Sequence, residues 1–141
     1  MPGRDLQRRV PPGPAQPGPY QVQAAIASCH GTAASPADTD WATIARLYTL
    51  LARLLPSPVV ELNRAVAVAM ADGPAAGLRL LDALGPAGLA GYYLLPATRA
   101  DLLRRLGQRD GAAASYREAL ALAPSDAERR YLTRRLAEVT G

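Results

Sequence analysis

The feature that most constrains this chain is a pattern of small and bulky apolar residues that recurs along it. Segments 41–56, 73–84 and 107–124 can be laid over one another so that tyrosines and alanines share the same slots. The shared positions are Tyr48 with Tyr116, Ala76 with Ala112, and Ala83 with Ala119. The alanine pairs lie 36 positions apart and the tyrosine pair 68, so the sequence contains two steps of about 34 residues.

A repeat of this length is typical of helical hairpins of the tetratricopeptide type. One hairpin cannot bury its apolar face alone, so successive hairpins stack into an array. No segment shows the alternation of a strand, and no sheet is expected. The fold class predicted is therefore all-α, a tetratricopeptide-like solenoid of stacked antiparallel hairpins closed by a C-terminal capping helix.

Local start and stop signals divide the chain into three hairpins and this cap. Asp40 and Ser57 are suitable N-caps, Pro58 suits a first helical position, and Gly73–Pro74 both ends one helix and begins the next. Ser125 and Glu128 match a capping box for the last helix. The expected helices span 20–30, 41–55, 58–72, 74–84, 92–106, 109–122 and 126–139.

Composition separates residues 1–19 from the domain expected over 20–141. Six of the 13 prolines lie in residues 1–19, which have no helical period and are expected to form a disordered or extended linker. The net charge is +4, and all 16 basic residues are arginine. With abundant Ala, Gly and Pro, this usage is typical of a GC-rich bacterium, although a basic chain can also mark a nucleic-acid surface.

Several small and aromatic residues are expected to have structural roles in the repeat. The alanines of the overlay should lie where helices of adjacent hairpins approach closely, so that a larger side chain would overpack. Trp41, next to the Asp40 cap, is expected to pack the first hairpin against the preceding loop. The structural positions predicted are Trp41, Tyr48, Ala76, Ala83, Ala112, Tyr116 and Ala119.

Polar residues on the inner helices are candidates for a partner-binding groove on the concave face. Asn63 and Arg64 interrupt an otherwise apolar helix, and an amide and a guanidinium can grip a peptide backbone or carboxylate. The alternative is intramolecular, with Asn63 holding the next hairpin and Arg64 paired with an acid such as Asp101. The full candidate set is Asn63, Arg64, Thr98, Asp101, Arg104 and Arg105.

The arginines of this set have two interpretations. Arg104 and Arg105, with Arg99 and Arg109 nearby, can engage an acidic partner or phosphates. Alternatively they form a solvated helix face balanced by acids such as Asp101.

Cofactor and metal chemistry are not expected. Cys29 and His30 are adjacent, but zinc requires three or four ligands and the chain has no second Cys or His. No phosphate-binding glycine loop or nucleophile motif is present. The lone cysteine suits a reducing cytoplasm, and no signal peptide or membrane span is recognised.

Five segments in order resemble the C-terminal extension of certain extracytoplasmic-function sigma factors. They read GPYQVQAAIASCH, TDWATIARLYTLL, SPVVELNRAVAVAMADGP, GYYLLPATRADLLRRLG and REALALAPSDAERRYLTRRLAEV, and the resemblance covers about residues 18–140. In that family a promoter-recognising sigma region precedes a tetratricopeptide-like helical domain. Those promoter-binding regions have no counterpart in this sequence, so promoter recognition is assigned to no residue here.

The resemblance implies a non-enzymatic domain that modulates transcription initiation by RNA polymerase through protein contacts. The partners implied are sigma regions or the polymerase, with no membrane and no direct DNA contact. Two other interpretations remain open: a free-standing adaptor that binds a peptide or protein in its concave groove, and a nucleic-acid-binding helical module.

Overall fold

The structure, a computed structural model, describes residues 17–33, 35–85 and 89–141, and these residues are almost entirely helical. A short 3-10 turn, η1 (Pro36–Asp38), interrupts the loop after the first helix. The α-helices are α2 (Pro19–Gly31), α3 (Trp41–Leu54), α4 (Pro58–Asp72), α5 (Pro74–Leu84), α6 (Leu94–Arg105), α7 (Arg109–Leu122) and α8 (Asp126–Thr140). Residues 1–16, most of the expected linker, lie outside the described residues.

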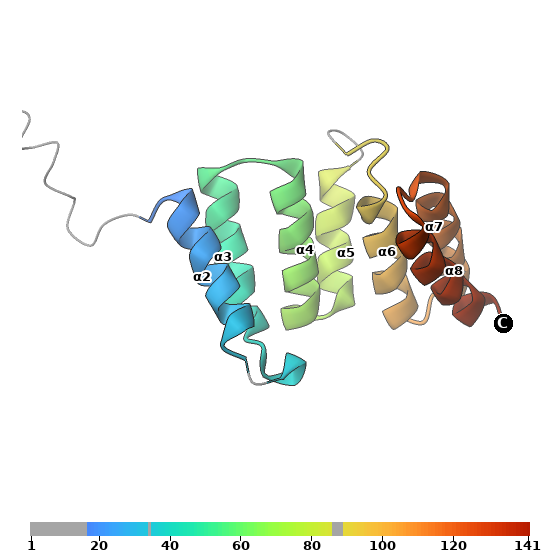
Figure 1. Ribbon diagram of the computed structural model, residues 1–141, viewed down its shortest axis with the longest axis horizontal. Coiled ribbons are helices and arrows are strands. Elements are labelled where there is room, and N and C mark those ends of the chain that lie inside the picture. Colours follow the sequence, from blue (N-terminus) through green and yellow to red (C-terminus); the bar gives the residue numbers. More distant parts are fainter. Residues whose placement is uncertain (1–16, 34, 86–88) are drawn as a thin grey trace, which may run out of the picture.

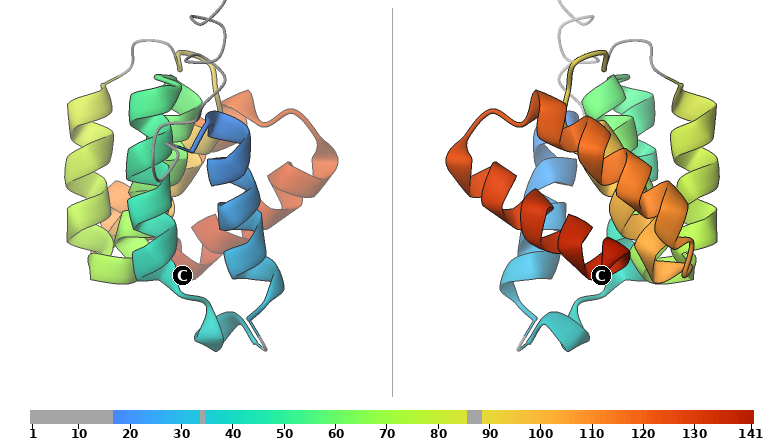
Figure 2. Two further views of the ribbon diagram at one scale, coloured as in Figure 1. Left: turned by 90° about the vertical axis from the view of Figure 1, so that its left-hand side faces the viewer. Right: turned by 90° about the vertical axis from the view of Figure 1, so that its right-hand side faces the viewer.

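The helices stand in a row along the long axis of the molecule, from α2 at one end to α7 and α8 at the other (Figure 1). Each helix packs against the one before and the one after it, and α6 also touches α4. Seen from the ends of the row, α8 crosses α7 at a clear angle (Figure 2). The expected all-helical stack of hairpins is confirmed, with no strand among the described residues.

Local capping explains why the helix ends agree closely with the sequence signals. The Asp40 carboxylate accepts hydrogen bonds from the Thr43 backbone N–H at 3.1 Å and the Thr43 hydroxyl at 2.7 Å, which lower its pKa. Ser57 Oγ accepts from the Val59 N–H at 3.2 Å, with Pro58 at the first helical position. Gly73 has φ 105°, a conformation that favours glycine, and it separates α4 from α5.

The expected capping box at the start of α8 does not form. Ser125 occupies the N-cap position, but its side chain makes no capping hydrogen bond. Glu128 lines a groove between α6 and α8 instead. The prediction of a capping box from the S-x-x-E pattern was therefore wrong, because the Glu128 side chain lies at the boundary with α6 rather than over the first turn of its own helix.

The core consists of three apolar clusters in sequence along the row. The first joins α2, α3 and α4, the second α4, α5 and α6, and the third α6, α7 and α8. On α4, Val60 and Ala67 belong to the first cluster, whereas Ala65 and Ala69 belong to the second. Because α4 and α6 bury two faces each, they link neighbouring clusters into one array.

Small residues allow the helices to approach closely, but not always at the alanines expected. Ala112 and Ala119 are fully buried, and so is Tyr116. Ala76 is only half-buried and Ala83 is exposed, so the prediction of a close approach at Ala83 was wrong. The close approach on α5 is at Gly77, where an added Cβ would lie 2.6 Å from the Ala69 Cβ.

The remaining structural positions lie in the first cluster. Tyr48 packs half-buried against it, and so does Trp41. The Trp41 ring meets the His30 ring edge-on, with centroids 5.4 Å apart, so it closes α3 onto the last turn of α2. None of the described helices is long and apolar enough to cross a bilayer.

Candidate functional site

The six candidate residues do not share one surface. Asn63 and Arg64 lie on α4, and the other four lie on α6. Three of the six, Asn63, Thr98 and Asp101, line two grooves. Each of these grooves lies between two helices that are separated by one helix along the chain. The α2–α4 groove is lined by Gln23, Ile26, Ala27, Tyr48, Leu51, Val59, Val60 and Asn63. The α6–α8 groove is lined by Tyr93, Leu94, Ala97, Thr98, Asp101, Ala127, Glu128, Tyr131 and Leu132.

The α2–α4 groove is mainly apolar and has a volume of about 370 Å³. Asn63 is exposed at this groove, and its side chain makes no hydrogen bond within the described part of the chain. Its amide is therefore available to a ligand, and the alternative in which Asn63 holds the next hairpin has no contact to support it.

Arg64 is engaged within the molecule. Its Nε donates to Thr49 Oγ1 at 3.0 Å, which ties α4 to α3, and its NH1 lies 3.2 Å from the Glu61 carboxylate. The intramolecular alternative is the one that the geometry favours. The acid is Glu61, one turn earlier on the same helix, rather than Asp101.

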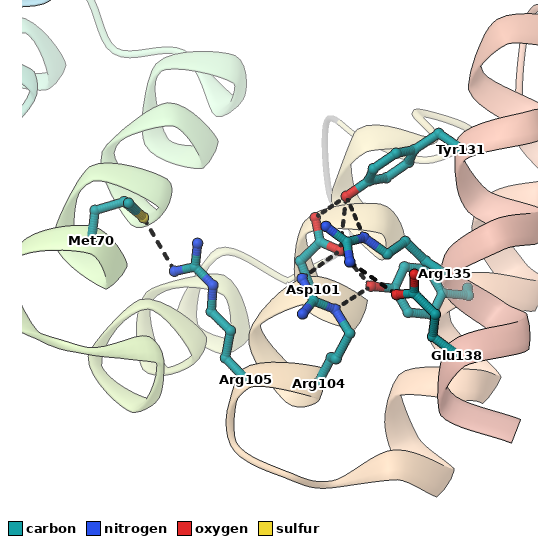
Figure 3. A network of polar contacts seen from close by, with 8 residues as sticks. Met70, Asp101, Arg104, Arg105, Tyr131, Arg135 and Glu138 are labelled. Carbon is teal, nitrogen blue, oxygen red and sulfur yellow. Dashed lines mark hydrogen bonds and ion pairs between the residues drawn. The ribbon is translucent and has the colours of Figure 1, made fainter. Parts of the chain in front are cut away.

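Asp101 is the centre of a polar network that joins α6, α7 and α8 (Figure 3). The Tyr116 hydroxyl donates a short hydrogen bond to Asp101 Oδ1, and the Tyr131 hydroxyl donates to both carboxylate oxygens at 3.3 and 3.2 Å. Each hydroxyl in turn accepts from a guanidinium, Tyr116 from Arg104 at 3.1 Å and Tyr131 from Arg135 at 3.4 Å. The two tyrosines thus satisfy both their donor and their acceptor capacity.

The network changes the protonation behaviour of its members. Burial, followed by the hydrogen bond to Asp101, raises the pKa of Tyr116 well above its ordinary value. The pKa of Arg135 is raised by its hydrogen bonds to Tyr131 and to Glu138, whose Oε1 lies 2.9 Å away. Both shifts favour the protonated forms in which these groups make their hydrogen bonds. Asp101 and Arg104 therefore fasten the last three helices together.

The other arginines of the predicted cluster, Arg99, Arg105 and Arg109, also make contacts between helices. Arg105 is exposed, and its NH1 lies 3.1 Å from the Met70 sulfur on α4 (Figure 3). Arg99 pairs with Asp82 on α5 at 2.5 Å, and Arg109 donates to the Glu138 carbonyl on α8 at 3.0 Å. The Arg99 pair supports the interpretation of arginines balanced by acids within the molecule, whereas Arg105 and Arg109 contact a sulfur and a carbonyl oxygen.

The α6–α8 groove brings together residues that sequence reasoning did not connect. Thr98 and Asp101 were expected there, but Tyr93, Tyr131 and Glu128 were not identified as groove residues. A signal was available on α8, because Glu128 and Tyr131 lie three positions apart and so share one helix face. What the sequence does not reveal is that this face meets α6.

Nothing in the described residues forms a metal site. No group of three or more His, Cys, Asp or Glu residues is placed to hold an ion within them. Cys29 is half-buried and packs beside the first apolar cluster.

Comparison with known proteins gives one informative match. An uncharacterized protein of Rhizobium meliloti (strain 1021) is 46% identical over 121 residues, which are 86% of this chain. The matched region is only 28% of the relative's length, so most of that protein has no equivalent here. No protein-family model matches the chain. No solved structure matches it either.

Proposed function

We propose that this chain is a non-enzymatic interaction domain that regulates a sigma factor and so modulates transcription initiation by RNA polymerase. The observation that carries the proposal is the five-segment resemblance over residues 18–140, which spans α2 to α8. The Rhizobium relative supports it, because there the same 121-residue stretch is 28% of a longer chain. A domain of this kind that recurs within a longer protein is consistent with a regulatory extension.

The stack of hairpins offers such a domain two means of binding. Grooves between alternate helices admit a segment of a partner, and the exposed faces of the array admit a folded surface. Because Arg64, Asp101 and Arg104 are already bonded within the chain, binding would depend on groove residues that make no hydrogen bond to the described part of the chain, above all Asn63. The proposed role implies a cytoplasmic protein.

A second candidate is a free-standing adaptor that binds a peptide in the concave groove. The α2–α4 groove favours this alternative, since it is apolar, about 370 Å³ in volume and bordered by the exposed amide of Asn63. An extended or helical segment with an apolar side chain and a free backbone carbonyl would suit that lining.

The test is capture of partners from cells of the source organism with the tagged full chain. Recovery of RNA polymerase or a sigma factor supports the proposal, whereas recovery of other proteins with no component of the transcription machinery favours the adaptor. Asn63→Ala is the informative variant, because the Asn63 side chain makes no hydrogen bond to the residues that the structure describes and the melting temperature should not change. Arg64→Ala is the matched control, since it should lower the melting temperature by breaking the contacts to Thr49 and Glu61.

An immunoblot of the same cells establishes the context of the domain. A band near 14.8 kDa would correspond to the 141-residue chain alone, and a much larger band to a domain within a longer protein. The second result favours the sigma-factor proposal.

A further inference from the structure

The lining of the α6–α8 groove contains acidic but no basic side chains. The groove has a volume of about 310 Å³, near the lower end of the range of about 300–1,000 Å³ found for ligand pockets. Two carboxylates, Asp101 and Glu128, and two tyrosines, Tyr93 and Tyr131, contribute its polar atoms together with Thr98. None of the lining residues is basic, although the chain as a whole carries a net charge of +4.

Glu128 is the unusual member of this lining. Its Oε2 atom is buried and has no hydrogen-bond partner among the described residues. The local use available to it, a capping box with Ser125, is not made. A buried carboxylate oxygen without a donor is costly in a folded protein, and a donor that entered the groove beside Glu128 would reduce that cost.

Asp101 and the two tyrosines shape the surroundings of that carboxylate. Both oxygens of Asp101 already accept from the Tyr131 hydroxyl, which fixes the Tyr131 ring, and Arg104 NH2 lies 3.8 Å from Asp101 Oδ1 and balances part of its charge. Burial and the nearby Glu128 charge raise the pKa of Tyr93, and its ring borders the same groove. The apolar side chains of Leu94 and Leu132 complete the walls.

We propose that the α6–α8 groove binds one basic side chain, an arginine or lysine, of a protein partner. The cationic head would donate to Glu128, and its aliphatic stem would lie along Leu94 and the ring of Tyr93. This inference rests on the proposed role as an interaction domain and adds the chemistry of the partner segment. An acidic side chain would be repelled by Glu128, and an apolar one would leave Glu128 without a donor.

Hydrogen bonding to a carboxylate and contact with an aromatic ring both make the groove complementary to a basic side chain. An ammonium or guanidinium forms charge-assisted hydrogen bonds to a carboxylate, and these are stronger than neutral ones. Tyrosine faces also attract a cation. Arg134 and Arg135 already lie over the Tyr131 ring, at 5.8 and 5.5 Å from its centre, which leaves Tyr93 as the aromatic surface for the incoming side chain.

The test is an NMR titration of the ¹⁵N-labelled full chain with Nα-acetyl-arginine amide, a capped single residue. Saturable shifts are expected at Tyr93, Thr98 and Glu128. The neutral isostere Nα-acetyl-citrulline amide should bind at least tenfold more weakly, since it lacks the charge. Equal shifts with both compounds, or no saturable shifts at these residues, would overturn the proposal. So would shifts with Mg²⁺ but none with capped arginine, which would indicate a metal site.

Glu128→Gln is the decisive variant and Glu118→Gln its control. Glu118 is an exposed carboxylate on α7 that does not line the groove. Glu128→Gln should reduce affinity for capped arginine at least tenfold without lowering the melting temperature, because it removes a charge that has no partner. Glu118→Gln should bind as the unaltered chain does. A Glu128→Gln protein that binds normally, or one that loses stability, would refute the assigned role.

These measurements need neither a sigma factor nor RNA polymerase. Binding of capped arginine without capture of the transcription machinery would contradict the proposed function and leave the groove assignment intact. Capture of polymerase by a chain that does not bind capped arginine would support the proposed function and contradict the groove assignment.

Discussion

Gly77 offers the sharpest test of how the array is packed. It lies inside α5, where a glycine to alanine change in an exposed helix would stabilise by about 1 kcal/mol through helix propensity. Here the added Cβ would lie 2.6 Å from the Ala69 Cβ and 2.9 Å from the Ala65 carbonyl oxygen. Neither atom can rotate away, so α4 and α5 must separate.

The two effects oppose each other, and packing should prevail. Overpacking a well-filled core costs about 1–3 kcal/mol, and the Leu102 Cδ1 atom, 3.1 Å from the new methyl group, adds to the crowding. Separation of α4 and α5 also weakens the contacts of the middle cluster, so the net loss should be about 1–2 kcal/mol. For a chain of 141 residues this lowers the melting temperature by about 3–8 °C.

Thermal and urea unfolding followed by circular dichroism would measure the effect of Gly77→Ala. Gly31→Ala is the matched control, because Gly31 is the last residue of α2 and a Cβ there has no neighbour within 4 Å. Adding Ala69→Gly to Gly77→Ala should recover part of the loss, since the nearest atom is removed. A Gly77→Ala protein as stable as the unaltered chain, or more so, would refute the close approach of α4 and α5.

Three further predictions concern residues of α5, α6 and α7. Ala112→Leu should destabilise by about 1–3 kcal/mol because Ala112 is fully buried, whereas Ala83→Leu, at an exposed site, should stay within about 0.5 kcal/mol; urea unfolding of the pair compares them. Asp101→Asn should cost about 1–3 kcal/mol in the same assay and loosen α8 in hydrogen exchange, since the carboxylate serves two hydroxyls. The raised pKa of Tyr116 contributes to folding stability, fully below pH 10, the value of an unfolded tyrosine. This contribution is lost as the pH rises through the higher pKa of the folded state. Tyr116→Phe should therefore flatten the decline in melting temperature at alkaline pH.

Helix boundaries were accessible from the sequence because their causes are local. Asp40, Ser57 and Gly73 act within a few residues of themselves, through capping hydrogen bonds or a positive φ, and each ends or begins a helix where expected. The 3.6-residue period then predicts which face is apolar. The capping box at Ser125 shows the limit of this reasoning, because Glu128 turned toward another helix.

The register of the repeat was not accessible in the same way. Aligning alanines gave a step of 36 residues between α5 and α7, yet the fully buried large residues of these helices, Leu81 and Tyr116, lie 35 positions apart. A shift of one residue rotates a helix by about 100° and leaves its composition unchanged. Only the neighbouring helix distinguishes a small residue in a contact from one in solvent.

The sequence by itself determined the helices, their order and the all-helical class, since propensity, capping and periodicity act over one or two turns. Tertiary structure decided which polar residues meet. Asp101 accepts hydrogen bonds from Tyr116 and Tyr131, which lie 15 and 30 positions away, and Glu128 lines a groove together with residues of α6. Hydrogen bonds and charges depend on separations of a few ångströms, and these are set by how the helices pack.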